Sequence, residues 1–313
     1  MGLLDIKIMT DKIIETFDLS KIYQLKGRKK EIRALDDVNI SINKGDIFGF
    51  LGPNGAGKTT MIQILTTLLQ PTSGYALIDG YNILKKPKKA KSKVSLMLES
   101  DMLYYRITAY DNLKFFCKIY NVSNYDQKIR DMTKAFGLEK WLNQYVEKFS
   151  SGMKMKLALL RTLLLDRDIM FLDEPTLGLD VKSKNFIIEI LRDVKKTIFL
   201  TSHDMGVVEK LCNRVAFINN GKILKIGTKE DIQQLKQTEV KINLDIHFEK
   251  RKLKSELKNQ DFINEIIDSK NGFLLELKGR DNYKDLLSIL VKYDITGINE
   301  QKESLEESFL KII

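Results

Sequence analysis

The sequence predicts an α/β fold, with one large domain built on a mostly parallel sheet and a small α+β domain after it. Residues 13–228 read as strands and helices in alternation, which is typical of a parallel sheet covered by helices. A glycine-rich turn follows the short apolar run of residues 46–51. From residue 240 the pattern becomes a strict alternation of apolar and polar residues, which indicates a half-buried strand. We therefore divide the chain into residues 1–228 and residues 229–313.

Local patterns predict several elements of the large domain. Pro71 stops the helix that follows the glycine-rich turn, because proline cannot continue a helix. The dipeptide Asn220-Gly221 between two apolar runs is a strong hairpin signal. The expected elements are a strand at 46–51, a helix at 59–69, a strand at 169–172, a helix at 181–196, a strand at 197–201 and a hairpin at 215–226.

The small domain is expected to be a separate α+β unit in which strands and helices alternate. Its expected elements are strands at 240–248, 272–277 and 295–298, and helices at 262–267, 283–293 and 305–312.

Composition excludes several classes of protein. Hydrophobic residues make up 43% and charged residues 30%, which is ordinary for a soluble globular protein. No run of residues reaches the roughly 18 apolar positions of a membrane helix, since Arg161 interrupts the most apolar stretch. Asp5 and Asp11 stand where a signal peptide would have its apolar core. We expect a cytoplasmic protein whose membrane association comes through partners or surface charge.

The net charge of +10 does not by itself indicate nucleic acid binding. The densest basic run, at residues 85–93, has no aromatic residues between its lysines, so we interpret it as a solvated surface segment. The two cysteines, Cys117 and Cys212, form neither a disulfide framework nor a paired metal motif. We expect both to be buried thiols.

The strongest motif is the glycine-rich turn itself. Residues 52–59 read Gly-Pro-Asn-Gly-Ala-Gly-Lys-Thr, the pattern of a phosphate-binding loop, and they stand between an apolar strand and a helix. Glycines let backbone N–H groups turn inward around phosphate oxygens, and the helix adds its positive end. Lys58 would reach the β- and γ-phosphates, and the Thr59 hydroxyl would bind Mg²⁺.

A second motif ends the strand at residues 169–172. The carboxylates of Asp173 and Glu174 follow directly, an arrangement that suits metal-assisted phosphoryl transfer. Asp173 would hold Mg²⁺, usually through water, and Glu174 would act as general base on the attacking water.

With these motifs in this order, residues 13–228 resemble the ATP-binding cassette (ABC) family. Residues 149–153, Phe-Ser-Ser-Gly-Met, stand where the family has its signature Leu-Ser-Gly-Gly-Gln, so Ser151 and Met153 depart from it. The resemblance implies that Ser150 and the backbone of Gly152 face ATP held by an opposite subunit.

The resemblance extends to three further positions. Residues 177–180 resemble the D-loop that couples the two sites of the dimer, and residues 201–204 resemble the switch-histidine loop. It implies that His203 contacts the γ-phosphate and helps to hold the water. It also implies that Tyr23 stacks on adenine, although Phe17 is a nearby aromatic alternative.

The site implied in this way uses ATP and Mg²⁺. Its catalytic residues are Glu174 and His203, and its metal ligands are Thr59, Asp173 and Glu99. Its nucleotide-binding residues are Tyr23, Gly52, Pro53, Asn54, Gly55, Ala56, Gly57, Lys58, Thr59, Thr60, Ser150 and Gly152.

Glu99 is a departure from the family. It aligns with the Q-loop glutamine, which in the family reaches Mg²⁺ and senses the membrane partner. Two interpretations stay open: Glu99 lies outside the site, or its carboxylate replaces the amide oxygen near the ion.

The resemblance implies an ATPase that forms a dimer around two ATP and drives separate transmembrane permease subunits. It would bind neither nucleic acid nor the transported substrate, and it would sit on the cytoplasmic face of the membrane. Residues 102–108, within a helical subdomain at about 100–165, are similar to exporters of drugs, lipids or polysaccharides, and residues 304–310 resemble the end of the accessory domain in that group. A soluble, regulatory or immunity ABC ATPase and an importer subunit stay as alternatives.

Overall fold

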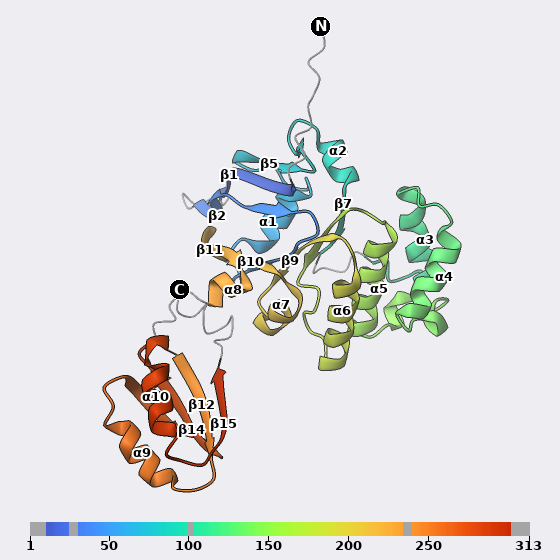
Figure 1. Ribbon diagram of the computed structural model, residues 1–313. Coiled ribbons are helices and arrows are strands. Elements are labelled where there is room, and N and C mark those ends of the chain that lie inside the picture. The colour runs from blue at the N-terminus through green and yellow to red at the C-terminus, as the bar shows by residue number, and fades with distance from the viewer. Residues whose placement is uncertain (1–10, 25–30, 99–102, 234–239, 302–313) are drawn as a thin grey trace. The chain divides into compact units, whose positions relative to one another are not determined.

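The computed structural model describes residues 11–24, 31–98, 103–233 and 240–301. The chain divides into two compact units, residues 1–229 and residues 230–312, which we describe separately (Figure 1). The helix predicted at residues 305–312 lies outside the described residues.

The first unit is built on a central sheet. Within the described part of the chain, this sheet has six strands in the order β11-β10-β4-β9-β8-β7, and only β11 is antiparallel to its neighbour. The predicted parallel sheet is therefore confirmed. Its strands are β4 (Ile47–Leu51), β7 (Val94–Met97), β8 (Ile169–Asp173), β9 (Thr197–Ser202), β10 (Arg214–Asn219) and β11 (Lys222–Thr228).

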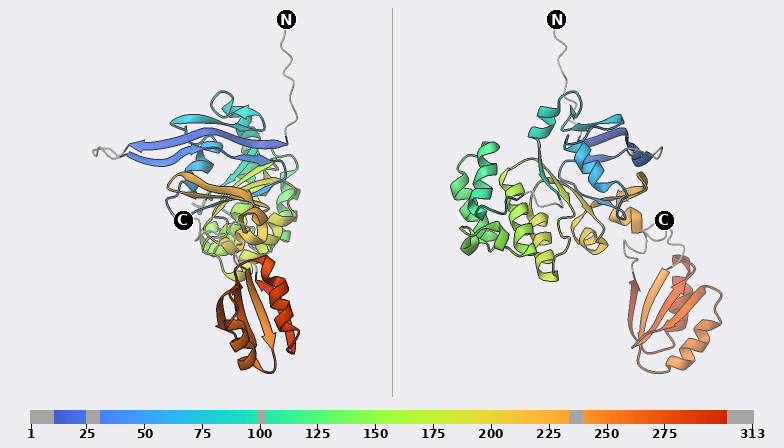
Figure 2. Two further views of the ribbon diagram at one scale, coloured as in Figure 1. Left: turned by 60° about the vertical axis from the view of Figure 1, so that its left-hand side comes forward. Right: turned by 180° about the vertical axis from the view of Figure 1, so that it is seen from behind.

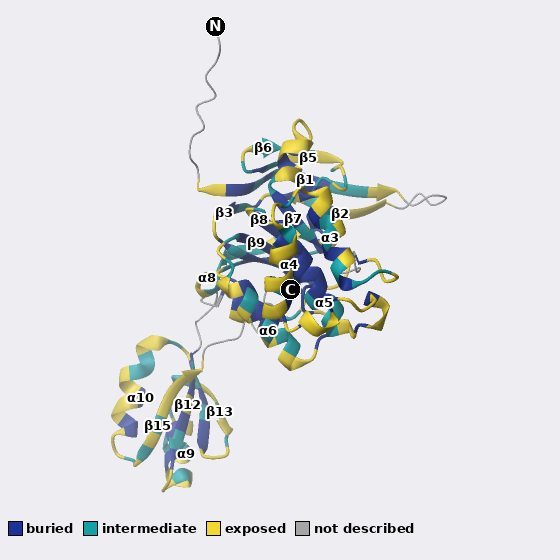
Figure 3. Cartoon of the chain, turned by 90° about the vertical axis from the view of Figure 1, so that its right-hand side faces the viewer, coloured by how far each residue is buried: buried dark blue, intermediate teal, exposed yellow. Residues whose placement is uncertain are grey.

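The central strands are almost entirely apolar because helices cover both faces of a parallel sheet. Phe48, Phe50, Phe171 and Phe199 are fully buried. The ring of Phe199 lies 5.4 to 5.8 Å from the other three rings. Figure 3 shows buried residues, in dark blue, along these strands. This rigid layer fixes the strand ends from which the candidate site is built.

The hairpin predicted at Asn220-Gly221 joins β10 to β11. Both turn residues have positive φ, +47° and +77°, as a two-residue hairpin turn of this kind requires. This turn also supports the glycine-rich loop, because the Gly221 N–H donates to the carbonyl of Ala56 at 3.0 Å.

A second, antiparallel sheet was not anticipated from the sequence. It has the order β2-β1-β5-β6, with β3 paired to β1. Figure 2 shows β1 and β2 as a long antiparallel pair. Its strands are β1 (Lys12–Gln24), β2 (Glu31–Val38), β3 (Ser41–Asn43), β5 (Ser73–Ile78) and β6 (Tyr81–Asn82).

Helices complete the first unit. The helix after the glycine-rich loop ends at Leu65, earlier than predicted, because Thr67 takes a left-handed φ of +60°. The helices are α1 (Lys58–Leu65), α2 (Pro87–Ser92), α3 (Ala109–Ile119), α4 (Tyr125–Ala135), α5 (Ser151–Leu164), α6 (Val181–Asp193), α7 (Met205–Leu211) and α8 (Lys229–Gln233), with short 3₁₀ turns at Glu139–Trp141 and Val146–Lys148.

Helices α3, α4 and α5 pack together as a helical cluster (Figure 1). Thr108 caps α3 by accepting the Asp111 N–H at 3.0 Å. Both cysteines are buried and free, as predicted, and burial raises the pKa of the Cys117 thiol to about 11. Among the described residues, none of the helices has the length and apolar character that crossing a membrane requires.

The second unit has a sheet in the order β13-β14-β12-β15, all antiparallel. The apolar side chains of β12 and β14 pack with those of two helices in one core. Its elements are β12 (Val240–Ile246), α9 (Lys250–Lys258), β13 (Ile263–Asp268), β14 (Gly272–Leu277), a 3₁₀ turn (Arg280–Asn282), α10 (Tyr283–Leu290) and β15 (Ile295–Gln301).

The prediction of a helix at residues 262–267 was wrong, because this segment forms strand β13. Three isoleucines favour a strand there, and pairing with β14 satisfies its backbone. The helix lies earlier, in α9, whose sequence is mostly charged. Only Leu253 and Leu257 of α9 are buried, one turn apart, and this stripe was too narrow to be recognised.

Candidate functional site

The turn between β4 and α1 is a loop that requires glycine at two positions. A Cβ on Gly52 would lie 2.2 Å from the carbonyl oxygen of Ile218. A Cβ on Gly57 would lie 2.2 Å from the carbonyl oxygen of Ala34, and Gly57 has a left-handed φ of +112°. Gly55 and Gly57 line the pocket described below, so this wall presents backbone rather than side chains.

Helix α1 begins directly after the loop. Its first N–H to find an acceptor one turn back is that of Met61, which donates to the carbonyl of Gly57 at 3.0 Å. The N–H groups of Lys58, Thr59 and Thr60 therefore have no acceptor within the helix. Free N–H groups at the positive end of a helix are a good fit for the phosphates of a nucleotide.

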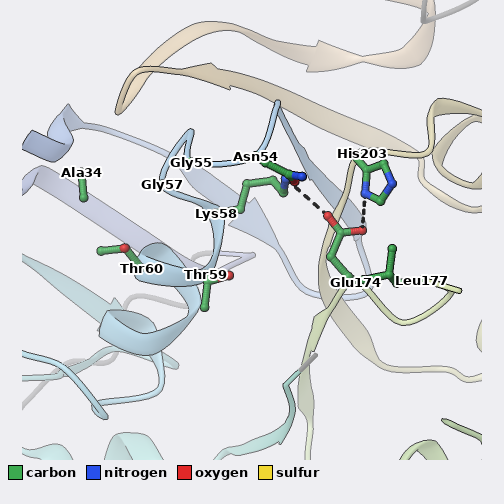
Figure 4. A pocket seen from close by; sticks show the side chains of 10 residues that line it. All are labelled: Ala34, Asn54, Gly55, Gly57, Lys58, Thr59, Thr60, Glu174, Leu177 and His203. Atoms are coloured by element: carbon green, nitrogen blue, oxygen red, sulfur yellow. Dashed lines mark hydrogen bonds and ion pairs between the residues drawn. The ribbon is translucent and has the colours of Figure 1, made fainter. Parts of the chain in front are cut away.

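Lys58, Glu174 and His203 form a chain of contacts across the pocket (Figure 4). The Lys58 Nζ lies 3.3 Å from one carboxylate oxygen of Glu174, and the His203 Nδ1 lies 3.0 Å from the other. Lys58 also donates to the carbonyl of Gly52 at 2.8 Å. Lys58 and Glu174 are both buried, whereas the His203 side chain is 47% exposed. A buried ammonium and carboxylate thus stabilise each other inside the pocket.

The pocket has a volume of about 370 Å³. It combines backbone donors, one cation and one carboxylate, which is the chemistry that a bound phosphate chain and an attacking water need. Its lining residues are Ala34, Asn54, Gly55, Gly57, Lys58, Thr59, Thr60, Glu174, Leu177 and His203.

Asp173 lies at the end of β8, buried beside this pocket. One carboxylate oxygen accepts a hydrogen bond from the Thr59 hydroxyl at 2.9 Å. The other accepts a hydrogen bond from the Thr201 hydroxyl at 2.5 Å. A carboxylate and a hydroxyl are the hard oxygen ligands that Mg²⁺ prefers, so Thr59 and Asp173 fit such an ion.

Glu174 occupies an unusual backbone conformation. Its φ is +49°, a left-handed value that costs energy for a residue with a Cβ. Its N–H donates to both the carbonyl oxygen and the hydroxyl of Thr201, at 3.2 and 3.1 Å. These bonds hold the strained turn. As a result, the side chains of these adjacent residues point to different sites. Asp173 accepts the hydrogen bond from Thr59, and Glu174 lines the pocket.

An ion pair supports the loop that bears His203. The Lys184 ammonium on α6 lies 2.7 Å from Asp204, which follows His203 directly. Asp204 also caps α7 by accepting the Val207 N–H at 3.2 Å. Burial alone would raise the pKa of Asp204, but the hydrogen bonds from Lys184 and Val207 outweigh it and lower the pKa. Lys184 therefore connects the helix after residues 177–180 to the histidine loop.

If the chain hydrolyses ATP as the resemblance implies, Lys184→Met should lower the kcat about tenfold with little change in KM, because a small displacement of His203 is enough to slow the reaction. The pKa of Asp204 is depressed in the folded chain, so the ion pair stabilises the fold above the ordinary aspartate pKa. That stability is lost as the pH falls through the lowered value. We expect the Tm difference between wild type and variant to be present at neutral pH and to vanish in acid.

Lys184→Arg should restore most of the rate, and Lys195→Met, at an exposed position after the same helix, should leave it unchanged. A Lys184→Met protein with wild-type kcat, or with a Tm difference independent of pH, would contradict a positioning role for this pair.

Residues 149–153, the predicted signature segment, lie next to α6, the helix that follows residues 177–180. Ser150 caps α5, and its hydroxyl accepts the Met153 N–H at 3.3 Å. A Cβ on Gly152 would lie 3.3 Å from the Ser183 hydroxyl on α6. Asp180 caps α6 and accepts the Ser183 N–H at 3.0 Å, a hydrogen bond that lowers the pKa of Asp180. Gly152 thus lies against the first turn of α6.

The predicted residues fall into three groups. The structure brings together the phosphate loop, Asp173, Glu174 and His203. Ser150, Gly152 and Tyr23 are not among the residues that line this pocket. Tyr23 is 36% exposed on β1, with the Lys21 ammonium 5.4 Å from its ring centroid. Glu99, predicted as a metal ligand, lies outside the described residues.

Sequence reasoning missed two residues that contribute to the site, Ala34 in the pocket lining and Thr201 behind the carboxylates. Ala34 packs its carbonyl against Gly57, but nothing in the sequence marks a small residue on a separate strand as a neighbour of the loop. The Thr201 hydroxyl and carbonyl hold Asp173 and Glu174. Its place at the end of a strand, two residues before His203, was a signal that could have found it.

Comparisons with known proteins identify the family. A family model described as "ABC transporter" matches residues 35–177. The ABC transporter ATP-binding protein NatA of Bacillus subtilis is 37% identical over 233 residues, which are 72% of this chain and 94% of that protein. The bacitracin transport ATP-binding protein BcrA of Bacillus licheniformis is 32% identical over 308 residues, which are 96% of this chain and 97% of that protein.

A solved structure gives the same result. The structure of an ATP binding subunit of an ABC transporter superposes with a TM-score of 0.64 at 28% identity, covering 71% of this chain and 92% of that one. The chain therefore belongs to the ABC transporter family and is an ATP-binding subunit with ATPase activity.

Proposed function

We propose that the chain hydrolyses ATP as one half of a dimer and drives separate membrane subunits of an exporter. One observation supports the dimer above all. The pocket is lined by residues 54, 55 and 57–60 of the phosphate loop together with Glu174 and His203, but Ser150 and Gly152, which the family resemblance assigns to the nucleotide, are not among its lining residues. A second copy that presents its own signature segment would complete the pocket.

Hydrolysis follows from the contacts of Glu174. The Lys58 ammonium and the His203 ring contact its two carboxylate oxygens. When ATP binds, Lys58 turns to the phosphate oxygens and frees one oxygen of Glu174 for a water molecule. Glu174 takes a proton from this water, the water oxygen bonds to the γ-phosphorus, and the bond from the γ-phosphorus to the bridging oxygen breaks, leaving ADP and phosphate.

Mg²⁺, when bound by Thr59 and Asp173, would neutralise charge on the β- and γ-phosphate oxygens. Thr201 keeps the Asp173 carboxylate in place through the hydrogen bond of 2.5 Å. His203, on its separate loop, stays next to the base. These residues hold the reacting groups in position.

An apolar surface on the helical cluster supports the proposal that the chain binds a membrane subunit. An apolar groove of about 580 Å³ is lined by Leu103, Tyr104, Tyr105, Arg106, Ile107 and Phe115. The rings of Tyr104 and Phe115 are 51% and 41% exposed, and they pack edge to face. Exposed aromatic residues gathered in a groove are typical of a protein interface.

Export is the direction that we propose. One of the relatives that match nearly the full length of the chain is named for bacitracin transport. In this arrangement the chain lies on the cytoplasmic face of the membrane, held by the permease subunits, and residues 230–312 serve as an accessory unit.

Phe115→Asp should reduce recovery of the chain with its membrane subunit at least about tenfold, because a buried, unpaired carboxylate is costly in an apolar interface. The chain is co-expressed with a polytopic membrane protein from its own genome and purified in detergent after a high-salt wash. Phe248→Asp, at a position 70% exposed in the second unit, is the matched control.

The complex should hydrolyse ATP several times faster than the chain alone. If Phe115→Asp and Phe248→Asp were recovered equally well, the groove would not be the docking site. If no membrane protein raised the ATPase rate, the regulatory alternative would be favoured.

A further inference from the structure

Helix α2 and the turn before it present a dense basic surface. The side chains of Lys85, Lys86, Lys88, Lys89 and Lys91 are exposed, and no carboxylate of the described residues forms an ion pair with them. We name these five lysines, together with Leu84, the α2 patch. Lys93 is not part of it, because its ammonium pairs with Asp79 at 2.9 Å.

The backbone holds this patch in a fixed arrangement. The Asn82 side chain accepts the N–H groups of Leu84 and Lys85 at 2.9 and 3.1 Å. Pro87 stands at the start of α2, and Ala90 anchors the helix in the core of the first unit. The charges are thus carried by an ordered turn, so binding a charged surface would cost little additional backbone entropy.

The chemistry of the patch fits an anionic lipid surface better than nucleic acid. Leu84 is 47% exposed directly before the first lysine of the patch, and an apolar side chain beside cations is typical of segments that lie on a bilayer. Base stacking would need a free aromatic ring. The nearby Tyr81 is half-buried, and the Lys89 ammonium lies 5.6 Å from its ring centroid.

The location of the α2 patch in the first unit also favours binding to a lipid surface. Lys91 lines a second groove of about 210 Å³ together with Leu68, Phe116 and Tyr120. Phe116 is the sequence neighbour of Phe115 and packs against Tyr104, so this groove continues the surface proposed for the membrane subunit. A permease seated there would bring α2 close to the headgroups of the surrounding bilayer.

We propose that the α2 patch binds the anionic headgroups of the cytoplasmic leaflet and helps to set the orientation of the ATPase beneath its membrane subunit. The orienting role rests on the proposed function, because that function is what places the chain at the membrane. The binding of lipid headgroups itself needs only this chain. Cytoplasmic leaflets are negatively charged, and each lysine near such a surface contributes about a fivefold factor in binding.

The purified full chain is sedimented with phosphatidylcholine vesicles, with and without phosphatidylglycerol, at low and high salt. Wild type should bind only the anionic vesicles and be released by salt. A variant with Lys85, Lys86, Lys88 and Lys91 each replaced by Gln should bind at least about tenfold more weakly. Lys89 is kept because of its contact with Tyr81.

The matched control replaces four exposed lysines of the second unit by Gln, which changes the net charge equally. These are Lys258, Lys270, Lys278 and Lys284. It should bind vesicles like wild type. Equal losses in the two variants, no loss in the α2 variant, or tighter binding of a DNA duplex than of anionic vesicles would overturn the proposal. ATP-dependent dimerisation is measured on the same samples, so a failure of the patch is distinguished from a failure of the proposed function.

Discussion

Glu174→Gln should lower the rate of ATP hydrolysis by at least about a hundredfold, because a positioned general base contributes a factor of this size or more. The amide cannot take a proton from water. It can still accept a hydrogen bond from Lys58, whose Nζ lies 3.3 Å from the Glu174 carboxylate, so the pocket should keep its shape. Phosphate release at saturating Mg-ATP measures the effect.

Glu189→Gln is the control, since Glu189 is exposed on α6 and makes no ion pair within the described residues. It should hydrolyse ATP at the wild-type rate. Should Glu174→Gln retain a third or more of the wild-type rate, another group would have to act as the base.

Lys58→Met should weaken ATP binding by about ten- to a hundredfold, because hydrogen bonds to a charged group contribute roughly 1.5–3 kcal/mol. Methionine keeps most of the length of the side chain but has no charge, and the position is buried. Without the ammonium, Glu174 is left with His203 as its side-chain partner and repels the phosphates. Equilibrium titration with a fluorescent ATP analogue measures the Kd.

Lys44→Met, at an exposed position of the same unit, should leave the Kd unchanged. An unchanged Kd for Lys58→Met would mean that Lys58 does not reach the phosphates, and that its contacts with Glu174 and the carbonyl of Gly52 are its main role.

Local sequence signals were sufficient wherever one segment determines its own structure. Three segments have residue patterns that are compatible with few other conformations. They are the phosphate loop, the apolar strand before Asp173 and the turn at Asn220-Gly221. The parallel sheet followed from apolar runs that must be buried on both faces. Periodicity failed in α9, where Leu253 and Leu257 are the only buried residues among charges.

Contacts between distant segments were beyond such signals. The antiparallel sheet depends on β1 pairing with β2, β3 and β5, and no single strand of it reveals its partners. The Lys184–Asp204 ion pair depends on how α6 packs beside the histidine loop. The contact of Ala34 with the loop depends on how β2 packs beside Gly57. In each case the role of the residue depends on a neighbour that only the folded chain brings close to it.

The most direct measurement is light scattering of the Glu174→Gln protein with and without Mg-ATP. Loss of the base should leave ATP bound and uncleaved, so the mass should rise from 36.2 kDa to that of a dimer only when ATP is present. That result would mean that each pocket needs the signature segment of a second chain. A protein that binds ATP tightly yet stays a monomer would contradict a site shared between two copies of this chain.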